Sequence, residues 1–148
     1  MIKWLNKENG FTLFELLVVI SIIGILISLA MVSYTNAQIK ARDSRGKSDI
    51  KAASDTFEQY FAGNDTYASC DTMAASSWVG PWPPTDPRGR QRGTADYSYT
   101  LNDDNCTASG YCICVELEQA VGGNASNNSC PSPSWVSNGA YFCLVNQQ

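Results

Sequence analysis

The fold is decided by an apolar stretch near the start of the chain, Phe11-Thr12-Leu13-Phe14-Glu15-Leu16-Leu17-Val18-Val19-Ile20-Ser21-Ile22-Ile23-Gly24-Ile25-Leu26-Ile27-Ser28-Leu29-Ala30-Met31-Val32. In these 22 residues Glu15 is the only charged side chain. A helix of this length is ~33 Å long, enough to cross the ~30 Å hydrocarbon layer of a bilayer. The sequence therefore predicts a membrane span. It is longer than the apolar part of a secretory signal, and no Ala-x-Ala cleavage site follows it.

The residues before this stretch differ sharply in composition. Residues 1–10 are mostly polar and contain Lys3 and Lys7, and the change to apolar residues is abrupt at Phe11. A short basic segment in front of an apolar span is typical of a targeting or processing segment. We therefore expect residues 1–10 to be a leader peptide.

The helix is expected to continue beyond the span. No proline or glycine interrupts the chain between Val32 and Gly46, and apolar residues then recur at three- and four-residue spacing: Ile50, Ala53, Phe57, Tyr60 and Phe61. Such spacing predicts an amphipathic helix. One helix should run from about residue 12 to residue 62, with a transmembrane half at 11–32 and an amphipathic half at 33–62. Gly63-Asn64 supplies a stop, and Gly46 is expected to fray or bend the helix.

Residues 63–148 are expected to form a globular head. Residues 64–93 are rich in proline and glycine but contain Trp78 and Trp82, which predicts an ordered loop packed on the helix. In residues 94–148 three strands are expected, at 97–101, 111–117 and 140–145, with a turn at 102–105 and a loop at 119–138. The predicted fold class is α+β, a long helix packed on a small antiparallel sheet of about three strands.

Six cysteines lie in the C-terminal portion: Cys70, Cys106, Cys112, Cys114, Cys130 and Cys143. Their even number and one-sided placement indicate three disulfides in an oxidising compartment. The chain has no histidine, so a zinc site would need thiolates alone, and no metal is expected.

The strand pattern of 111–117 limits how these cysteines pair. Alternation places Tyr111 and every second residue after it against the helix, and turns Cys112 and Cys114 outward, under a loop. These two are too far apart to bond each other easily. Pairing of Cys143 with one of them is favoured, and of the other with Cys106 or Cys130, while other connectivities remain open.

The composition excludes several classes of function. Without histidine, a phosphate-binding glycine loop or a nucleophile elbow, the chain is not expected to be an enzyme or to hold a cofactor. The net charge of −4 and the acids interleaved with the basic residues of 40–51 make nucleic acid an unlikely partner. Asp103 and Asp104 are interpreted as turn formers and not as calcium ligands.

The residues around the start of the span carry a specific signal, Gly10-Phe11-Thr12-Leu13-Phe14-Glu15-Leu16-Leu17-Val18-Val19-Ile20. A basic leader, a glycine, a phenylalanine, a glutamate four residues later and an uninterrupted apolar helix follow one another in fixed order. This string resembles the class III signal of type IV pilins and of the pseudopilins of type II secretion systems. The resemblance covers residues 1 to about 35 strongly and 37–67 loosely.

The resemblance implies a processing reaction and an assembly mechanism. A membrane peptidase would cut between Gly10 and Phe11 and methylate the new amine of Phe11. In the filament, the carboxylate of Glu15 would pair with the N-terminal amine of a neighbouring subunit, so that Phe11, Thr12 and Glu15 form the assembly site. Leaving either charge unpaired in an apolar environment is costly. The alternative for Glu15 is a favourable interaction with the helix dipole in the first turn.

Two other features of the span, its small residues and the lack of a proline at position 32, are not assigned to processing or to the charge pair. Ser21, Gly24 and Ser28 are small residues of the kind that lets membrane helices approach, and they indicate packing only. Many members of the family have a proline about twenty-two residues after the cut, where this chain has Val32. A kink at that place is therefore in doubt, and Gly24 replaces the proline only in part.

The resemblance also implies partners and location. The partners are other copies of the chain, further pilins, the prepilin peptidase, an inner-membrane assembly platform and the lipid bilayer. The head would lie outside the cytoplasm, and the subunit would leave the cytoplasmic membrane for an extracellular filament. Lys40, Arg42, Arg45 and Lys47 favour the opposite topology, but they begin eight residues past the span and precede a head that needs oxidation.

Three functions stay open at this point: a pilin of a surface fibre, which is favoured, a pseudopilin of a secretion system, and an ordinary single-pass membrane protein.

Overall fold

The computed structural model describes residues 10–92, 94, 96–101 and 103–146, and it divides into two compact units, Met1–Ala37 and Gln38–Gln148. Residues 1–9, which make up nearly all of the expected leader, lie outside the described residues. Each unit is treated by itself below.

Helix α1 (Leu13–Asn64) has 52 residues and contributes to both units. Its most apolar 18-residue window has a mean hydropathy of 2.8, and within the described residues it is the one helix long and apolar enough to cross a membrane. The helix ends at Asn64, and the next residue, Asp65, has a φ of 55° and donates its backbone N–H to the carbonyl of Phe61 at 2.8 Å. This left-handed residue after the last turn is a common helix stop.

The first unit is the apolar part of α1 with the residues just before it. Its large side chains are exposed along the whole length, from Leu13 at 81% to Leu29 at 68%. No charged residue occurs between Glu15 and Lys40. An apolar surface of this size needs lipid or another protein to cover it.

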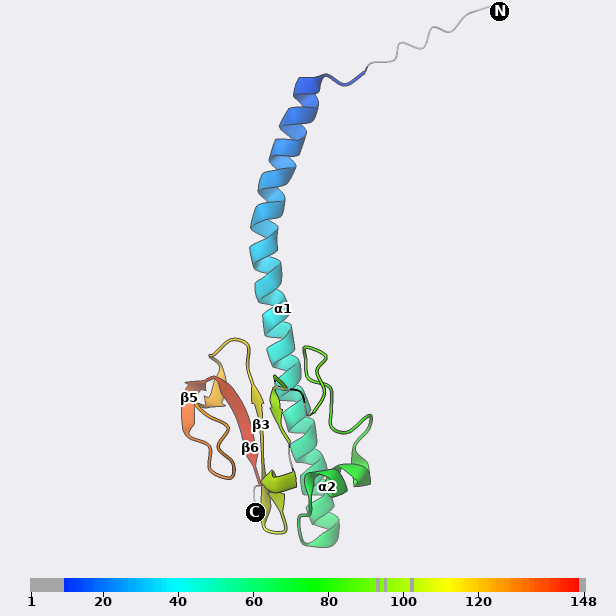
Figure 1. Ribbon diagram of the computed structural model, residues 1–148, viewed down its shortest axis with the longest axis vertical. Helices are drawn as coiled ribbons and strands as arrows, with labels where there is room; N and C mark the ends of the chain where they lie inside the picture. The colour runs from blue at the N-terminus through cyan, green and yellow to red at the C-terminus, as the bar shows by residue number, and fades with distance from the viewer. Residues whose placement is uncertain (1–9, 93, 95, 102, 147–148) are drawn as a thin grey trace, which may run out of the picture. The chain divides into compact units, whose positions relative to one another are not determined.

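The second unit contains the rest of α1, a short helix and a sheet (Figure 1). The elements are α2 (Cys70–Ser77), β1 (Tyr99–Thr100), a 3₁₀ turn (Asp103–Asn105), β2 (Cys106–Thr107), β3 (Gly110–Glu116), β4 (Gly123–Ala125), β5 (Trp135–Gly139) and β6 (Tyr141–Val145). The strand order is β1-β3-β6-β4-β5, with β2 paired to β3, and all pairs are antiparallel. The predicted α+β class, a long helix packed on an antiparallel sheet with disulfides, is confirmed.

The sheet is larger than the sequence predicted. It has six strands where about three were expected, because the segment 119–138, predicted as a loop, contains β4 and β5. The segment 64–93, also predicted as a loop, contains α2. The turn expected at 102–105 leads into the additional strand β2 before β3 begins. β4 and β5 contain Gly, Asn and Ser, which have low strand propensity, so periodicity did not reveal them.

One face of β3 builds the main core, as its alternation predicted. Tyr111, Ile113 and Val115 are buried in one cluster with residues of α1 that include Ile50 and Phe57. The ring of Phe57 meets that of Tyr111 edge to face at 5.2 Å. The predicted packing of the 64–93 segment on the helix is confirmed by Trp82, whose ring lies 5.8 Å from that of Phe57.

The other face of β3 carries Cys112 and Cys114 away from the helix and is buried under the segment 119–138, as expected. Cys112, Cys114, Cys143 and Ala125 form a second cluster, and Cys130 packs against it from the segment above. The disulfides are Cys70–Cys106, Cys112–Cys130 and Cys114–Cys143, so the favoured pairing of Cys143 with one cysteine of β3, and of the other with Cys106 or Cys130, is confirmed. β3 is thus a central strand with two apolar faces.

Gly46 does not fray the helix, contrary to the expectation. α1 continues through it, and Gly46 is buried against the sheet. A Cβ atom at this position would lie 3.0 Å from Cγ2 of Val115. Glycine here allows the helix backbone to approach β3 closely, so its role is in packing.

Gly123 on β4 and Gly139 on β5 have no room for a side chain, because backbone atoms of neighbouring strands lie where a Cβ would be. Gly139 is used here to test how much stability depends on this. A Cβ at Gly139 would collide with the backbone carbonyl of Ala125 on the neighbouring strand. Gly139→Ala is therefore expected to lower the free energy of unfolding by about 2 kcal/mol. The control is Gly63→Ala in α1, where a Cβ meets nothing within 4 Å, and which should leave stability unchanged or raise it by up to ~1 kcal/mol. Denaturant unfolding of both variants measures this, and equal effects would contradict the clash.

A buried carboxylate organises the turn at residues 86–90. Asp86 is fully buried and accepts hydrogen bonds from the backbone N–H groups of Arg88 (2.9 Å) and Arg90 (2.8 Å). Its second oxygen accepts from Nε of Arg90 at 2.7 Å and from the hydroxyl of Ser98 at 3.2 Å. Burial by itself raises the pKa of Asp86, but the bonds from Arg90 and Ser98 outweigh it and hold the pKa below its ordinary value.

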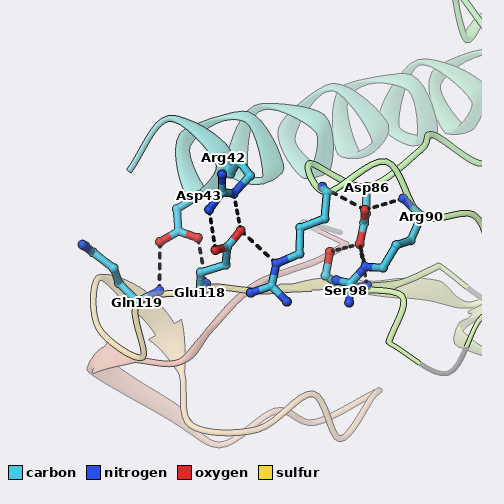
Figure 2. A network of polar contacts seen from close by, with 8 residues as sticks. Arg42, Asp43, Asp86, Arg90, Ser98, Glu118 and Gln119 are labelled. Atoms are coloured by element: carbon cyan, nitrogen blue, oxygen red, sulfur yellow. Dashed lines mark hydrogen bonds and ion pairs between the residues drawn. The ribbon is translucent and has the colours of Figure 1, made fainter. Parts of the chain in front are cut away.

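A second carboxylate joins this turn to the helix and the end of β3 (Figure 2). Glu118 binds Arg42 of α1 through both oxygens and Arg88 at 3.0 Å. Asp43 accepts from the backbone N–H groups of Glu118 (2.8 Å) and Gln119 (3.2 Å). The bonds from Arg42 and then Arg88 lower the pKa of Glu118 to about 2.

Glu118 should make the stability of the head depend on pH. Its pKa is lower in the folded chain than the ordinary value of 4.5, so its contribution is present above pH 4.5 and is lost as the pH falls towards 2. Glu118→Gln is expected to make the free energy of unfolding depend less on pH across this window, because the amide binds no proton. Denaturant midpoints at several pH values between 2 and 6 measure it. An unchanged slope would show that other carboxylates, such as Asp86, account for the acid sensitivity.

Candidate functional site

The candidate site lies where α1 begins, in the first unit. Residues 10–12 precede the helix, and Thr12 stands immediately before Leu13. The backbone N–H of Glu15 donates to Oγ1 of Thr12 at 3.1 Å. In return, Oε2 of Glu15 accepts from the backbone N–H of Thr12 and from its hydroxyl, both at 2.9 Å. This reciprocal pair is a capping box, in which two donors at the helix start are satisfied.

The capping box fixes the position of the carboxylate. Glu15 lies in the first turn of α1, where the positive end of the helix dipole favours a negative charge. The side chain is exposed, and so is the ring of Phe11, at 89%. The carboxylate therefore faces outward beside the backbone of residues 11 and 12, accessible to a second molecule while its own helix orients it.

In the part of the chain that the structure describes, nothing requires a glycine at position 10. A Cβ there would meet no atom within 4 Å, and its φ is not in the left-handed region. Gly10 and Phe11 are in non-helical chain ahead of the first turn. A side chain at position 10 can thus be introduced without disturbing the structure, which makes the position suitable for testing recognition by an external enzyme.

The small polar residues of the span satisfy their own hydrogen bonds. The hydroxyl of Ser21 donates to the carbonyl of Leu17 at 2.8 Å, and that of Ser28 to the carbonyl of Ile25 at 2.7 Å. A Cβ on Gly24 would meet nothing within 4 Å. The helix thus presents small residues with no unpaired hydroxyl, a surface suited to lipid or to a closely packed neighbouring helix.

Other side-chain groups in the described residues do not form a competing site. The sulfurs of Cys112, Cys114 and Cys130 lie within 4.8 Å of one another, but all three belong to disulfides and offer no thiolate to a metal. A groove of about 460 Å³ is lined by Arg42, Arg88 and Glu118, among others. These charged groups pair with each other, as described above.

The structure brings Thr12 and Glu15 into direct contact and leaves Gly10 and Phe11 next to them. The capping box was not recognised from the sequence, although the Thr-x-x-Glu spacing is its ordinary signature. The Asp86 turn was missed as well. Its signal was the string Asp86-Pro87-Arg88-Gly89-Arg90, which combines an acidic side chain, a proline and a glycine in the manner of a tight turn.

Comparison with known proteins places this N-terminal segment in a defined class. Residues 5–31 match the prokaryotic N-terminal methylation motif. The type IV major pilin protein PilA of Myxococcus xanthus is 34% identical over 62 residues, which are 42% of this chain and 28% of that protein. No solved structure gives a significant match.

Proteins of type II secretion systems are similar as well. Core protein G of Vibrio cholerae is 31% identical over 91 residues, 62% of each chain, and that of Escherichia coli is 39% identical over 62 residues, 42% of this chain and 43% of its own. The chain thus spans less than two thirds of the length of these curated relatives, and none of their names is that of an enzyme. The matches confirm the resemblance inferred from residues 10–20: the chain carries a prokaryotic N-terminal methylation motif and is similar to type IV pilins and type II secretion core proteins.

Proposed function

We propose that the chain is a prepilin that is cut after Gly10, methylated on the amine of Phe11 and polymerised through α1 into a type IV pilus-like filament. One observation carries the proposal: a single exposed carboxylate, Glu15, is held at the start of a charge-free apolar helix, four residues after the expected new N-terminus. In apolar surroundings this carboxylate needs a cationic partner, and the amine of Phe11 in a neighbouring copy is of the right charge.

The proposal includes a path through the cell. Residues 11–32 would anchor the subunit in the cytoplasmic membrane, residues 33–62 would continue the helix into the head, and residues 63–148 would complete that head outside the cytoplasm. Three disulfides support an oxidising compartment. The peptidase and an inner-membrane assembly platform would act on the subunit before it enters the extracellular filament with other pilins.

Processing is tested by mass spectrometry of the protein from its native host. The expected mature chain begins at Phe11 and carries a methyl group on its amine. Gly10→Val should leave the leader attached, since a branched side chain blocks the close approach that glycine allows. A chain that keeps Met1 in the wild type would contradict the proposal and favour an ordinary membrane protein.

The role of Glu15 in assembly is tested by separating its charge from its capping role. Glu15→Gln keeps an oxygen that can accept from Thr12, because glutamine also forms capping boxes, but it removes the charge. We expect it to lower the yield of sheared filaments at least ~tenfold, since the neighbour's amine is then unpaired in an apolar environment. Thr12→Val keeps the charge and removes the cap, and it should assemble far better than Glu15→Gln. The reverse order of the two variants would assign Glu15 to capping alone.

A pseudopilin of a type II secretion system is the second candidate. The alignment with core protein G of Vibrio cholerae favours it, because it covers 62% of this chain, whereas the alignment with the pilin covers 42%. Both candidates use the same leader, helix and Glu15. Shearing of intact cells distinguishes them, since a surface fibre is released into the medium and a secretion pseudopilin stays with the cells.

A further inference from the structure

The part of α1 that belongs to the head has opposite charge in its two halves. Residues 38–51 contain five basic and two acidic side chains, while residues 52–65 contain three acidic side chains and no basic one. The sign changes between Lys51 and Asp55. Charges on one helix are usually interleaved when they serve only to stabilise it by i,i+4 pairs, so this segregation calls for another explanation.

In the basic half, 38–51, the arginines and the acidic residues find partners inside the head. Arg42 binds Glu118, Arg45 lies 3.8 Å from Asp49, and Asp43 accepts the backbone N–H groups at the end of β3. What remains is a row of three lysines, Lys40, Lys47 and Lys51, spaced by seven and four residues on one helix face. Among the residues that the structure describes, none of the three forms an ion pair.

Two of these lysines are held in place by contacts with the sheet and the segment that follows β3. The ammonium groups of Lys47 and Lys51 both lie 5.9 Å from the ring centre of Phe142 on β6. Nζ of Lys47 also donates to the carbonyl of Gly122 at 2.6 Å. Lys40 and Lys51 are exposed. Two like charges at i,i+4 destabilise a helix unless an anion lies nearby, and no carboxylate in the described part of the head lies within ion-pair distance of these three ammonium groups.

The acidic half continues the same face. Asp55 follows Lys51 by four residues and is exposed, and Asp65 beyond the end of α1 is exposed too. In the described residues neither carboxylate forms an ion pair. The head therefore offers a basic row on α1, followed by two acidic residues, Asp55 on the helix and Asp65 just past its end.

We infer that the partner of this two-signed face is a second copy of the chain, displaced along the helix axis so that the lysine row of one copy lies beside Asp55 and Asp65 of the next. The centres of the two rows are about 14 residues apart, which corresponds to an axial displacement of about 20 Å. A lipid surface or a nucleic acid carries negative charge only, so either would satisfy the lysines and repel the acids. A displaced copy satisfies both rows and repeats the contact along the filament.

This inference rests on the proposed function and adds to it. The Glu15 pair would fix the ends of the apolar helices, while the rows in the heads would oppose displacements that bring like charges together. Each ion pair at a surface is weak, but the contact recurs at every subunit. Reversing the charge of one row turns a recurring attraction into a recurring repulsion.

The test uses full-length chains in the native host and two charge variants. Lys40→Glu with Lys51→Glu makes the face largely acidic and leaves Lys47 on Gly122. Asp55→Lys with Gln59→Lys makes the face largely basic and leaves Asp65, whose positive φ suits aspartate, unchanged. Asp104→Lys with Ser132→Lys adds the same charge as the second variant at exposed positions outside α1 and serves as the matched control.

Each row variant alone is expected to give at least ~tenfold fewer sheared filaments than the control, and co-expression of the two should restore them, because unlike faces can then alternate. Each variant has like charges at positions 51 and 55, and co-expression does not change this. A restored filament yield must therefore come from contacts between molecules. The loss should also shrink in high salt, where the Debye length falls to ~3 Å at 1 M. Non-reducing peptide mapping of the three disulfides checks that both variants are folded.

A yield within threefold of the control for either row variant, or a mixture no better than its components, would overturn the inference. Comparison with Glu15→Gln distinguishes a failure of this inference from a failure of the proposed function. If Glu15→Gln blocks filaments and the row variants do not, only the displaced-copy contact fails. If Glu15→Gln has no effect, the proposed assembly mechanism fails first.

Discussion

Replacement of Asp86 by alanine is expected to lower the free energy of unfolding by about 3–5 kcal/mol, which is the usual cost of removing one partner from a buried ion pair. Asp86 is fully buried and accepts two backbone N–H groups, the guanidinium of Arg90 and the hydroxyl of Ser98. Without the carboxylate these donors lose their acceptor, and Arg90 keeps a half-buried charge.

Denaturant unfolding of the full chain in detergent measures this effect, with tryptophan fluorescence as the signal. Asp86→Asn is expected to cost less, because one oxygen can still accept from the backbone, although the new NH₂ group faces donors. Asp96→Ala changes an exposed carboxylate ten residues further on and should stay within about 0.5 kcal/mol of the wild type. If Asp86→Ala were no worse than Asp96→Ala, the turn would not depend on this carboxylate.

Removal of the Cys70–Cys106 disulfide should have the second large effect. The two residues are 36 positions apart, and a closed loop of that length corresponds to about 3–4 kcal/mol of restricted freedom in the unfolded chain. The loop contains α2 and the whole Asp86 turn. Cys70→Ala with Cys106→Ala is expected to shift the unfolding midpoint accordingly, and both side chains are small enough to be replaced by alanine without a large cavity.

The control for the disulfide is chemical. In a thiol reductant that opens all three bridges, the wild type and the double variant should unfold at nearly the same denaturant concentration. Under oxidising conditions they should differ by several kcal/mol. A difference below about 1 kcal/mol under oxidising conditions would mean that residual structure already restricts this segment in the unfolded chain.

The parts of the fold that follow from periodicity were predictable from the sequence. The spacing of Ile50, Ala53 and Phe57 predicted a helix with one buried face, and the alternation in 111–117 predicted which side of β3 packs on it. Both predictions need only local geometry and the preference of apolar side chains for the interior.

The elements that the sequence did not predict depend on contacts between distant residues. β4 lies beside β6 partly through Asn124, whose side-chain amide accepts the backbone N–H of Cys143 at 2.7 Å and donates to its carbonyl at 2.8 Å. The short helix α2 depends on its cap, Ser69, which accepts the N–H of Thr72 at 3.2 Å. Neither has an apolar pattern to indicate it.

The same division holds for the polar groups. Glu15 was recognisable because a single charge in an apolar run is conspicuous, and the resemblance gave it a role. The bond between Arg42 and Glu118 joins residues 76 positions apart, and either side chain by itself is an ordinary surface charge. Such pairs become visible only when the helix and the end of β3 are placed side by side.

The hydrogen bonds at the start of α1 have a consequence for maturation. The box between Thr12 and Glu15 uses the amide and hydroxyl of Thr12 and no atom of residues 1–10. Hydrolysis of the Gly10–Phe11 bond would therefore create a positive end group two residues ahead of the first helical turn without unwinding it. The precursor and the mature subunit would have the same helix, and the cut would remove the leader and place a positive charge just ahead of the first turn.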